Sequence, residues 1–182
     1  MQVAAVTEAA AGEERSDLER VFVAHQARVF RAAYRITGNA EDAEDVLQSV
    51  FLRLARQAEG TLDVANASSY LYRAAINTAF DLLRSRRIRP NVPLDEAAEA
   101  PGTLPGPDAA QEAEEIRHWL RRALATLPPR AAEIFALRYL EGQANRDIAR
   151  LLGISRISVA VSLHRTRQRL QSELGQWKRG RR

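Results

Sequence analysis

The chain has 182 residues, of which 46% are hydrophobic and 27% charged, and this composition indicates a soluble globular protein with one domain or two small ones. It contains no cysteine, which excludes disulfides, thiolate zinc sites and thiol catalysis, and its dispersed histidines do not form a zinc-binding pair. The net charge of +4 conceals a division, because residues 117–182 carry 15 basic and 4 acidic side chains, or +11, and the rest of the chain carries −7. 

The N-terminal third is expected to begin with a loose tail and to continue as two helices. Residues 1–16 are rich in Ala and Glu without clear periodicity, which is typical of a loose tail. From Asp17 the apolar spacing predicts a helix that ends at Gly38, since glycine readily adopts the left-handed conformation of a helix end. A second helix is predicted from Asp42 to Arg56, with carboxylates in its first turn where they favour the helix dipole.

Residues 57–69 interrupt the periodicity and are predicted to be mostly loop, and a third helix is predicted from Tyr70 to Arg87. The outer face of this helix carries a polar and aromatic ridge, spaced three and four residues apart, made of Tyr70, Arg73, Asn77, Asp81 and Arg84. The simplest interpretation of the ridge is a solvated surface with a basic end. Asp81 is expected to pair with Arg84 or with an arginine of the first helix. The whole unit is expected to span residues 17–90.

Residues 91–115 contain Pro, Gly and seven acidic side chains but no basic one, a composition that predicts a flexible linker. A helix is expected to resume near Asp108 or Gln111. The second domain is predicted over residues 116–175, followed by a solvated basic tail at 176–182. The fold class is therefore all-α, with two small helical domains.

The second domain contains a helix-turn-helix pattern. A short helix is predicted from Asn145 to Leu152, a turn at Gly153, and a longer helix capped by Ser155. At about 100° per residue, one side of the longer helix is apolar and is predicted to face the core, with Val159, Leu163, Thr166 and Leu170. The opposite side has the position of a major-groove reader and carries Ile157, Val161, His164, Arg165 and Gln168, flanked by Arg156, Ser158 and Arg167.

Together the two units resemble one protein family. The segments FVAHQARVFRAAYRITGNAEDAEDVLQSVFLRLA and YLYRAAINTAFDLLRSRR resemble region 2 of bacterial RNA polymerase sigma factors, and LPPRAAEIFALRYLEG with DIARLLGIS and LHRTRQRL resembles region 4. The short linker without an intermediate domain resembles the extracytoplasmic-function (ECF) subfamily. The resemblance implies a subunit that binds core RNA polymerase and directs promoter-specific initiation. Expected partners are the clamp helices of the largest polymerase subunit, the polymerase flap, promoter DNA and an anti-sigma factor.

The resemblance also assigns roles to particular residues. Contact with the polymerase clamp is implied for Asp45, Gln48 and Arg53. Capture of the melted strand at the downstream (−10) element is implied for Tyr70, Arg73, Asn77, Arg84, Arg86 and Arg87; an aromatic platform and cations that follow the backbone are what single-strand binding requires. Reading of the upstream (−35) element is implied for Arg156, Ile157, Ser158, Ala160, Val161, Ser162, His164, Arg165 and Arg167.

The predicted reading helix departs from its relatives. Many of these carry a Thr-Val-Lys-Ser-Arg-Leu-like run where this chain has SVAVSL at 158–163, so two cations are missing. Outward Ile157 and Val161 are hypothesised to contact thymine methyl groups. The usual capping Ser of the preceding helix is replaced by Ala144, and Asn145 is the predicted substitute cap.

Two other functions stay open at this point: a stand-alone helix-turn-helix regulator, and a sigma mimic that titrates an anti-sigma factor. An enzyme is not expected, because the sequence offers no nucleophile-base pair, metal-ligand cluster or phosphate-binding loop. We therefore expect no cofactor and no metal. The N-terminus lacks a signal-peptide pattern and no apolar run is long enough to span a membrane, so we expect a cytoplasmic monomer that an anti-sigma factor can hold at the membrane.

Overall fold

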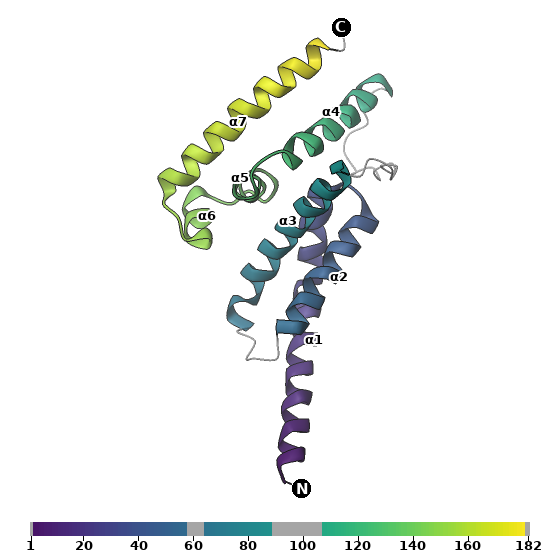
Figure 1. Ribbon diagram of the computed structural model, residues 1–182, viewed down its shortest axis with the longest axis vertical. Coiled ribbons are helices and arrows are strands. Elements are labelled where there is room, and N and C mark those ends of the chain that lie inside the picture. The colour runs from purple at the N-terminus through teal and green to yellow at the C-terminus, as the bar shows by residue number, and fades with distance from the viewer. Residues whose placement is uncertain (1, 58–63, 89–106, 181–182) are drawn as a thin grey trace.

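The computed structural model describes residues 2–57, 64–88 and 107–180, and the side chains of 19–56, 67–87 and 110–180. Over these residues the fold is all-α, as predicted, and contains no strand (Figure 1). None of the described helices is long and apolar enough to cross a lipid bilayer. The elements in chain order are α1 (Gln2–Thr37), α2 (Ala40–Gln57), α3 (Val64–Ile88), α4 (Pro107–Ala125), α5 (Pro129–Phe135), the π-helical turn η1 (Ala136–Leu140), α6 (Asn145–Leu152) and α7 (Arg156–Arg179).

Helices α1, α2 and α3 pack together as a three-helix bundle (Figure 1). Gly38 ends α1 with φ +71°, a conformation that side chains other than glycine rarely adopt. The Asn39 side chain accepts a hydrogen bond from the Asp42 amide at 3.0 Å and so caps the start of α2. This two-residue connection lets α2 fold back against α1, and the bundle core contains the fully buried side chains Val29, Val46, Val50, Leu71, Tyr72 and Ile76.

Three helix starts differ from the expected positions. Helix α1 begins at Gln2, not after a loose tail at 1–16, and α3 begins at Val64, not at Tyr70. Alanine is frequent in both added stretches and is the strongest helix former, so the backbone continues as helix where apolar periodicity fails. Helix α4 begins at Pro107, close to the predicted restart near Asp108 but inside the predicted linker. The other parts of the predicted loop and linker, residues 58–63 and 89–106, lie outside the described residues.

The C-terminal part contains α4 to α7. Proline residues 128 and 129 start α5, where a missing amide costs nothing because the first turn has no helical acceptor. Helix α7 continues to Arg179, through half of the expected basic tail. Near its end Trp177 packs against Trp119 of α4, with ring centroids 6.3 Å apart and planes inclined by 38°.

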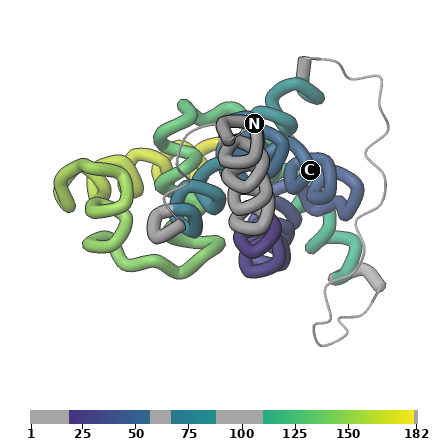
Figure 2. Tube along the Cα trace, turned by 90° about the horizontal axis from the view of Figure 1, so that it is seen from below, coloured from purple at the N-terminus to yellow at the C-terminus, as the bar shows by residue number. Residues whose placement is uncertain are grey.

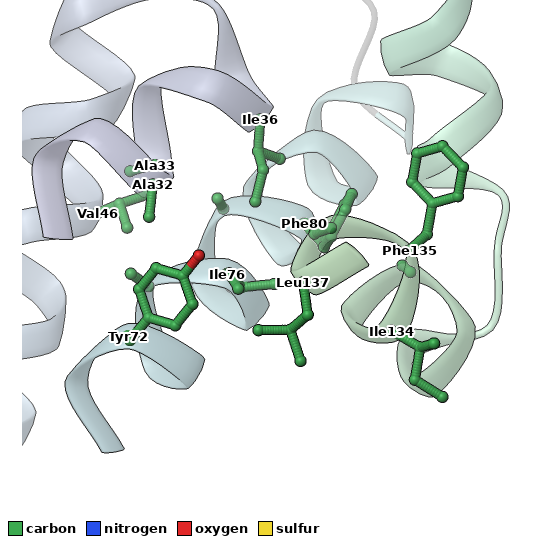
Figure 3. Close-up of a cluster of buried hydrophobic side chains, with 14 of the residues drawn as sticks. Ala32, Ala33, Ile36, Val46, Tyr72, Ile76, Phe80, Ile134, Phe135 and Leu137 are labelled. Atoms are coloured by element: carbon green, nitrogen blue, oxygen red, sulfur yellow. The ribbon is translucent and has the colours of Figure 1, made fainter. Parts of the chain in front are cut away.

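The two parts share one continuous apolar core. Helix α3 contacts α4 and α5 as well as its partners in the N-terminal bundle. Figure 3 shows Ile76 and Phe80 of α3 in one cluster with Ile134 and Leu137 from α5 and η1, and all four are at most 2% exposed. Although two units joined by a linker are predicted, in this structure they lie in direct contact through α3.

Candidate nucleic-acid interface

The helix-turn-helix is built by α6, the turn at Gly153 and α7, within the bounds predicted from the sequence. Gly153 has φ +62°, and its amide bonds to carbonyls in the last turn of α6. The Ser155 hydroxyl accepts a hydrogen bond from the Ser158 amide at 3.0 Å, which confirms it as the cap of α7. The four residues predicted for the core side of α7, Val159, Leu163, Thr166 and Leu170, are its buried residues.

The opposite side of α7 is open to solvent over its first three turns. Ile157 is 76% exposed and Val161 42% exposed, so this side presents two large aliphatic side chains to solvent. Among the described residues, the Arg156, Arg165 and Arg167 guanidinium groups have no carboxylate within ion-pair distance. The structure places all nine predicted upstream-reading residues on this surface, Ser162 half-buried and the others exposed: Arg156, Ile157, Ser158, Ala160, Val161, Ser162, His164, Arg165 and Arg167.

A groove of about 510 Å³ runs beside this surface, between α7 and the start of α5. Val161 and Arg165 line one wall, and Pro128 and Ala131 line the other. Arg169, at the end of the groove, is already engaged, because it donates to Glu173 at 2.8 Å and to the Thr126 hydroxyl at 2.9 Å. Val161 therefore faces both outward solvent and an apolar groove.

The predicted substitute cap of α6 is wrong. Ala144 occupies the cap position and offers no side-chain hydrogen bond, while Asn145 is already the first helical residue. A capping side chain must come from an extended residue before the helix, so the Asn145 oxygen is one residue too late. Its Oδ1 atom is buried and accepts no hydrogen bond. Helix α6 thus begins without a side-chain cap.

The residues of α3 predicted to hold the melted strand differ in their exposure and in their ion-pair partners. Tyr70 is 37% exposed, Arg87 is exposed and Asn77 is half-buried. Arg84 donates to Asp81 at 2.7 Å, which confirms the expected intramolecular pair. Arg73, in contrast, donates its Nε to the Glu133 carboxylate of α5 at 2.9 Å.

Arg86, also predicted to hold the melted strand, points back into the bundle. It forms an ion pair with Asp42, whose side chain is 1% exposed. Burial raises the pKa of the Asp42 carboxyl above its usual value, and the Arg86 guanidinium opposes that rise. Arg86 therefore neutralises a buried carboxylate in this structure, and only its half-buried outer part faces solvent.

The predicted polymerase contacts lie on the outer surface of α2, where Asp45, Gln48 and Arg53 are all exposed. Gln48 also lines a groove of about 640 Å³ between α1 and α2. 

The apolar residues of this α1–α2 groove are absent from the predicted site. They include Phe22, Val23, Phe30 and Leu47, of which Val23 is 70% exposed. Phe22 is 37% exposed and packs edge-on against Phe51, with ring centroids 4.7 Å apart. Neighbouring Phe22 and Val23 cannot both face one core from a helix, which was the available sequence signal.

No group of three or more His, Asp or Glu side chains suited to a metal ion occurs within the described ranges.

Comparison with known proteins identifies the class. Residues 21–88 match the family model of Sigma-70 region 2, and residues 117–170 match that of Sigma-70 region 4. The chain is 32% identical over 151 residues to the ECF RNA polymerase sigma factor SigE of Mycolicibacterium smegmatis, and this match covers 82% of the chain but 58% of that relative. It is 31% identical over 158 residues to the RNA polymerase sigma-E factor of Streptomyces coelicolor, covering 87% of the chain and 86% of the relative.

A solved structure shows the same fold. The sigma factor RpoE of Bartonella quintana, crystallised with the anti-sigma factor NepR, superposes with a TM-score of 0.51 at 20% identity, over 87% of this chain and 97% of that one. The matched regions thus define a sigma-70-type transcription initiation factor, a class of proteins that are not enzymes. The chain belongs to the ECF subfamily of the RNA polymerase sigma factors.

Proposed function

We propose that this chain is a dissociable promoter-specificity subunit whose three exposed surfaces divide the work of initiation. The α1–α2 groove and the outer face of α2 bind core RNA polymerase. The exposed side of α7 reads the upstream promoter element as duplex. The ridge of α3 holds the unpaired strand of the downstream element through Tyr70 and its arginines.

The observation that carries this proposal is the division of α7 into two sides. One side supplies buried core residues, and the other presents three arginines that have no carboxylate partner among the described residues, beside Ile157 and Val161. Guanidinium groups bind phosphates and base edges, while apolar side chains contact thymine methyl groups. A surface made only for solvation would not need its two large aliphatic side chains exposed.

Run-off transcription with purified core RNA polymerase and a promoter library tests the proposal. The expected result is a set of specific start sites that depends on this protein. A stand-alone regulator would instead bind duplex DNA tightly without polymerase, and a sigma mimic would give no starts. Either of those results would refute the proposal.

One arginine-to-alanine variant and one lysine-to-alanine control, both on α7, test which part of the helix binds the upstream element. Arg165→Ala is expected to weaken upstream binding by holoenzyme and to reduce the salt slope by about 1, because one phosphate contact is lost. Lys178→Ala, at the other end of α7, is the matched control and should leave both unchanged. Equal effects of the two variants would show that only overall charge matters.

A double variant tests the assignment of α3. Tyr70→Ala with Arg84→Ala is expected to reduce open-complex formation more than closed-complex binding, since stacking on an unpaired base and contact with its backbone arise only after melting. Permanganate footprinting of unpaired thymines measures the first and filter binding at low temperature the second. Equal losses in open-complex formation and closed-complex binding would show that α3 does not capture the unpaired strand.

A further inference from the structure

Glu133 is a buried carboxylate shared between the two parts of the chain. It lies in α5 and is 3% exposed. Its Oε1 atom accepts from Arg73 of α3 at 2.9 Å, and its Oε2 atom accepts from Arg130 of α5 at 2.9 Å. A buried charge is costly unless it is paired and hydrogen-bonded. Glu133 is therefore fully paired only while α3 lies against α5.

Two further contacts join the parts on the side of α1. Arg35 donates one amino group to the Leu140 carbonyl at 2.8 Å and to Glu141 at 3.0 Å. It thereby satisfies a carbonyl at the end of η1, where helical acceptors lack partners. The Arg121 guanidinium of α4 lies so close to Gly38 that a Cβ atom there would be 2.0 Å from it. The interface is thus held at three separate points.

The interface engages one residue of the proposed strand-binding ridge, Arg73, and leaves the exposed side of α7 open. Phe80, two turns after Arg73 in α3, lies in the apolar cluster with α5 and η1 and is 1% exposed. Figures 1 and 2 show α6 and the start of α7 on the far side of the molecule from α2, away from the contact with α3. Ile157, at the start of α7, is 76% exposed in this same arrangement.

We propose that α5 and η1 act as an autoinhibitory latch on α3. In the free protein Glu133 is an internal anion that occupies Arg73, the donor proposed for a phosphate of the opened strand. The strand-binding ridge becomes complete only when the two parts separate, whereas the reading face of α7 is available throughout. This inference rests on the proposed role of α3 in strand capture.

The full-length chain can report the latch directly by energy transfer. Because the protein has no cysteine, Ser49→Cys on α2 and Ser172→Cys on α7, both exposed, provide two label sites. In this background Glu133→Gln keeps the shape of the side chain but removes its charge, and is expected to lower the transfer efficiency. Arg130→Gln removes the pair inside α5 but keeps the bond from Arg73, so it is the matched control and should retain the efficiency.

A single-stranded DNA oligonucleotide with a fluorescent end label measures the consequence. If the closed form makes up about 90% of the free protein, opening raises the apparent affinity for this probe about tenfold, since affinity scales with the competent fraction. Glu133→Gln should show this gain. Arg73→Gln should open the molecule equally but show no gain, and duplex binding by α7 should not respond to Glu133→Gln.

The outcomes separate the latch from the proposed function. Unchanged energy transfer in Glu133→Gln, or equal opening by Arg130→Gln, overturns the latch, as does opening without any gain in single-strand binding. If Glu133→Gln opens and gains affinity while holoenzyme with Arg73→Gln melts promoters normally, the latch stands and the role of Arg73 in the open complex fails. Circular dichroism verifies folding, and Arg35→Gln gives a second opening variant at an exposed contact.

Discussion

At the scale of single residues, the exposed side of α7 carries short and aliphatic side chains at positions where many relatives carry cations. Ser158, Ala160 and Ser162 are short, so Ile157 and Val161 extend beyond them on the exposed side of α7. Aliphatic side chains recognise the thymine methyl group, whereas cations bind phosphates of any sequence. If α7 reads the upstream element as proposed, this face favours sequence discrimination over general affinity.

Replacing thymine by uracil in the upstream element removes only the methyl group. We expect each critical replacement to weaken holoenzyme binding by about 0.8 kcal/mol, or roughly fourfold, the value of one buried methyl. In Ile157→Ala or Val161→Ala, replacing the contacted thymine by uracil should not weaken binding further. Fluorescence anisotropy measures the affinity of the unmodified and the variant protein for each of the two DNAs, and these four values give the coupling energy. Strictly additive losses would show that no methyl contact exists.

Val161→Lys tests the same hypothesis from the opposite direction. A cation at this position should change which promoters are chosen, because it exchanges a methyl contact for a phosphate or base contact. Sequencing of transcripts from a promoter library measures this choice. Stronger binding everywhere with an unchanged ranking of promoters would contradict the idea.

Gly38 and Gly142 form a matched pair of residues for a stability prediction. Both have positive φ, +71° and +68°, but a Cβ at Gly38 meets Arg121 while one at Gly142 meets nothing within 4 Å. Gly142→Ala should cost about 1 to 2 kcal/mol of unfolding free energy from backbone strain alone. Gly38→Ala should cost more, and the excess should vanish in an Arg121→Ala background. Urea unfolding measures all four values; an equal cost at both glycines would mean that the Arg121 contact is unimportant.

At the scale of elements, the two helices of the helix-turn-helix begin in nearly the same way but are capped differently. Ala144 has φ −73° and ψ 148°, and Ser155 has φ −72° and ψ 151°. Only Ser155 carries a hydroxyl that accepts an amide of the first turn. The backbone at Ala144 is therefore already suited to a capping side chain.

Reciprocal substitutions at these two positions should have opposite effects. Ser155→Ala is expected to lower the unfolding free energy by about 1 kcal/mol, and Ala144→Ser to raise it by a similar amount. Thermal and urea unfolding provide the measurement. A neutral Ala144→Ser would show that the α6 start is held by its surroundings and gains nothing from a cap.

The groove between α1 and α2 makes its own prediction. Val23→Glu places a charge at a 70% exposed position, so stability should change little, whereas binding to core polymerase should weaken if the groove is buried there. Leu52→Glu, at an exposed position of α2 that does not line the groove, is the comparison. Titration of labelled protein with core polymerase compares the two. If only Leu52→Glu weakened binding to core polymerase, the polymerase contact would lie outside the groove.

Elements were predictable wherever apolar periodicity and a terminating residue occurred together. The span of α6, the cap at Ser155 and the four buried positions of α7 follow from spacing and capping chemistry alone. The starts of α1 and α3 do not, because alanine extends a helix without an apolar stripe. The π-helical turn η1 carries no signature in spacing that would separate it from α-helix.

At the scale of the whole molecule, the pairing of distant charges was not predictable. Glu133 and Arg73 are 60 residues apart, and each is unremarkable within its own helix. The same holds for Arg35 with Glu141 and for Arg86 with Asp42. Without knowledge of the topology, the sequence does not indicate which arginine pairs with which carboxylate. Periodicity identifies which face is buried, but only the packed structure shows which helix covers it.

The continuous core predicts that the two parts unfold together. Calorimetry of the full chain should show a single transition, because the apolar cluster on α3 belongs to both parts. A Glu133→Gln, Arg35→Gln double variant should separate this into two transitions. Two transitions already in the unmodified protein would show that the parts are thermodynamically independent.

The contact between Trp119 and Trp177 confines the tryptophan fluorescence of this protein to its C-terminal part. These are the two tryptophans of the chain, and both belong to the C-terminal part. Tryptophan fluorescence therefore reports on α4 and α7 alone, whereas the far-ultraviolet dichroism of so helical a protein reports on every element. Comparing the two signals in one unlabelled sample distinguishes events confined to the upstream-reading half from events that involve the whole chain.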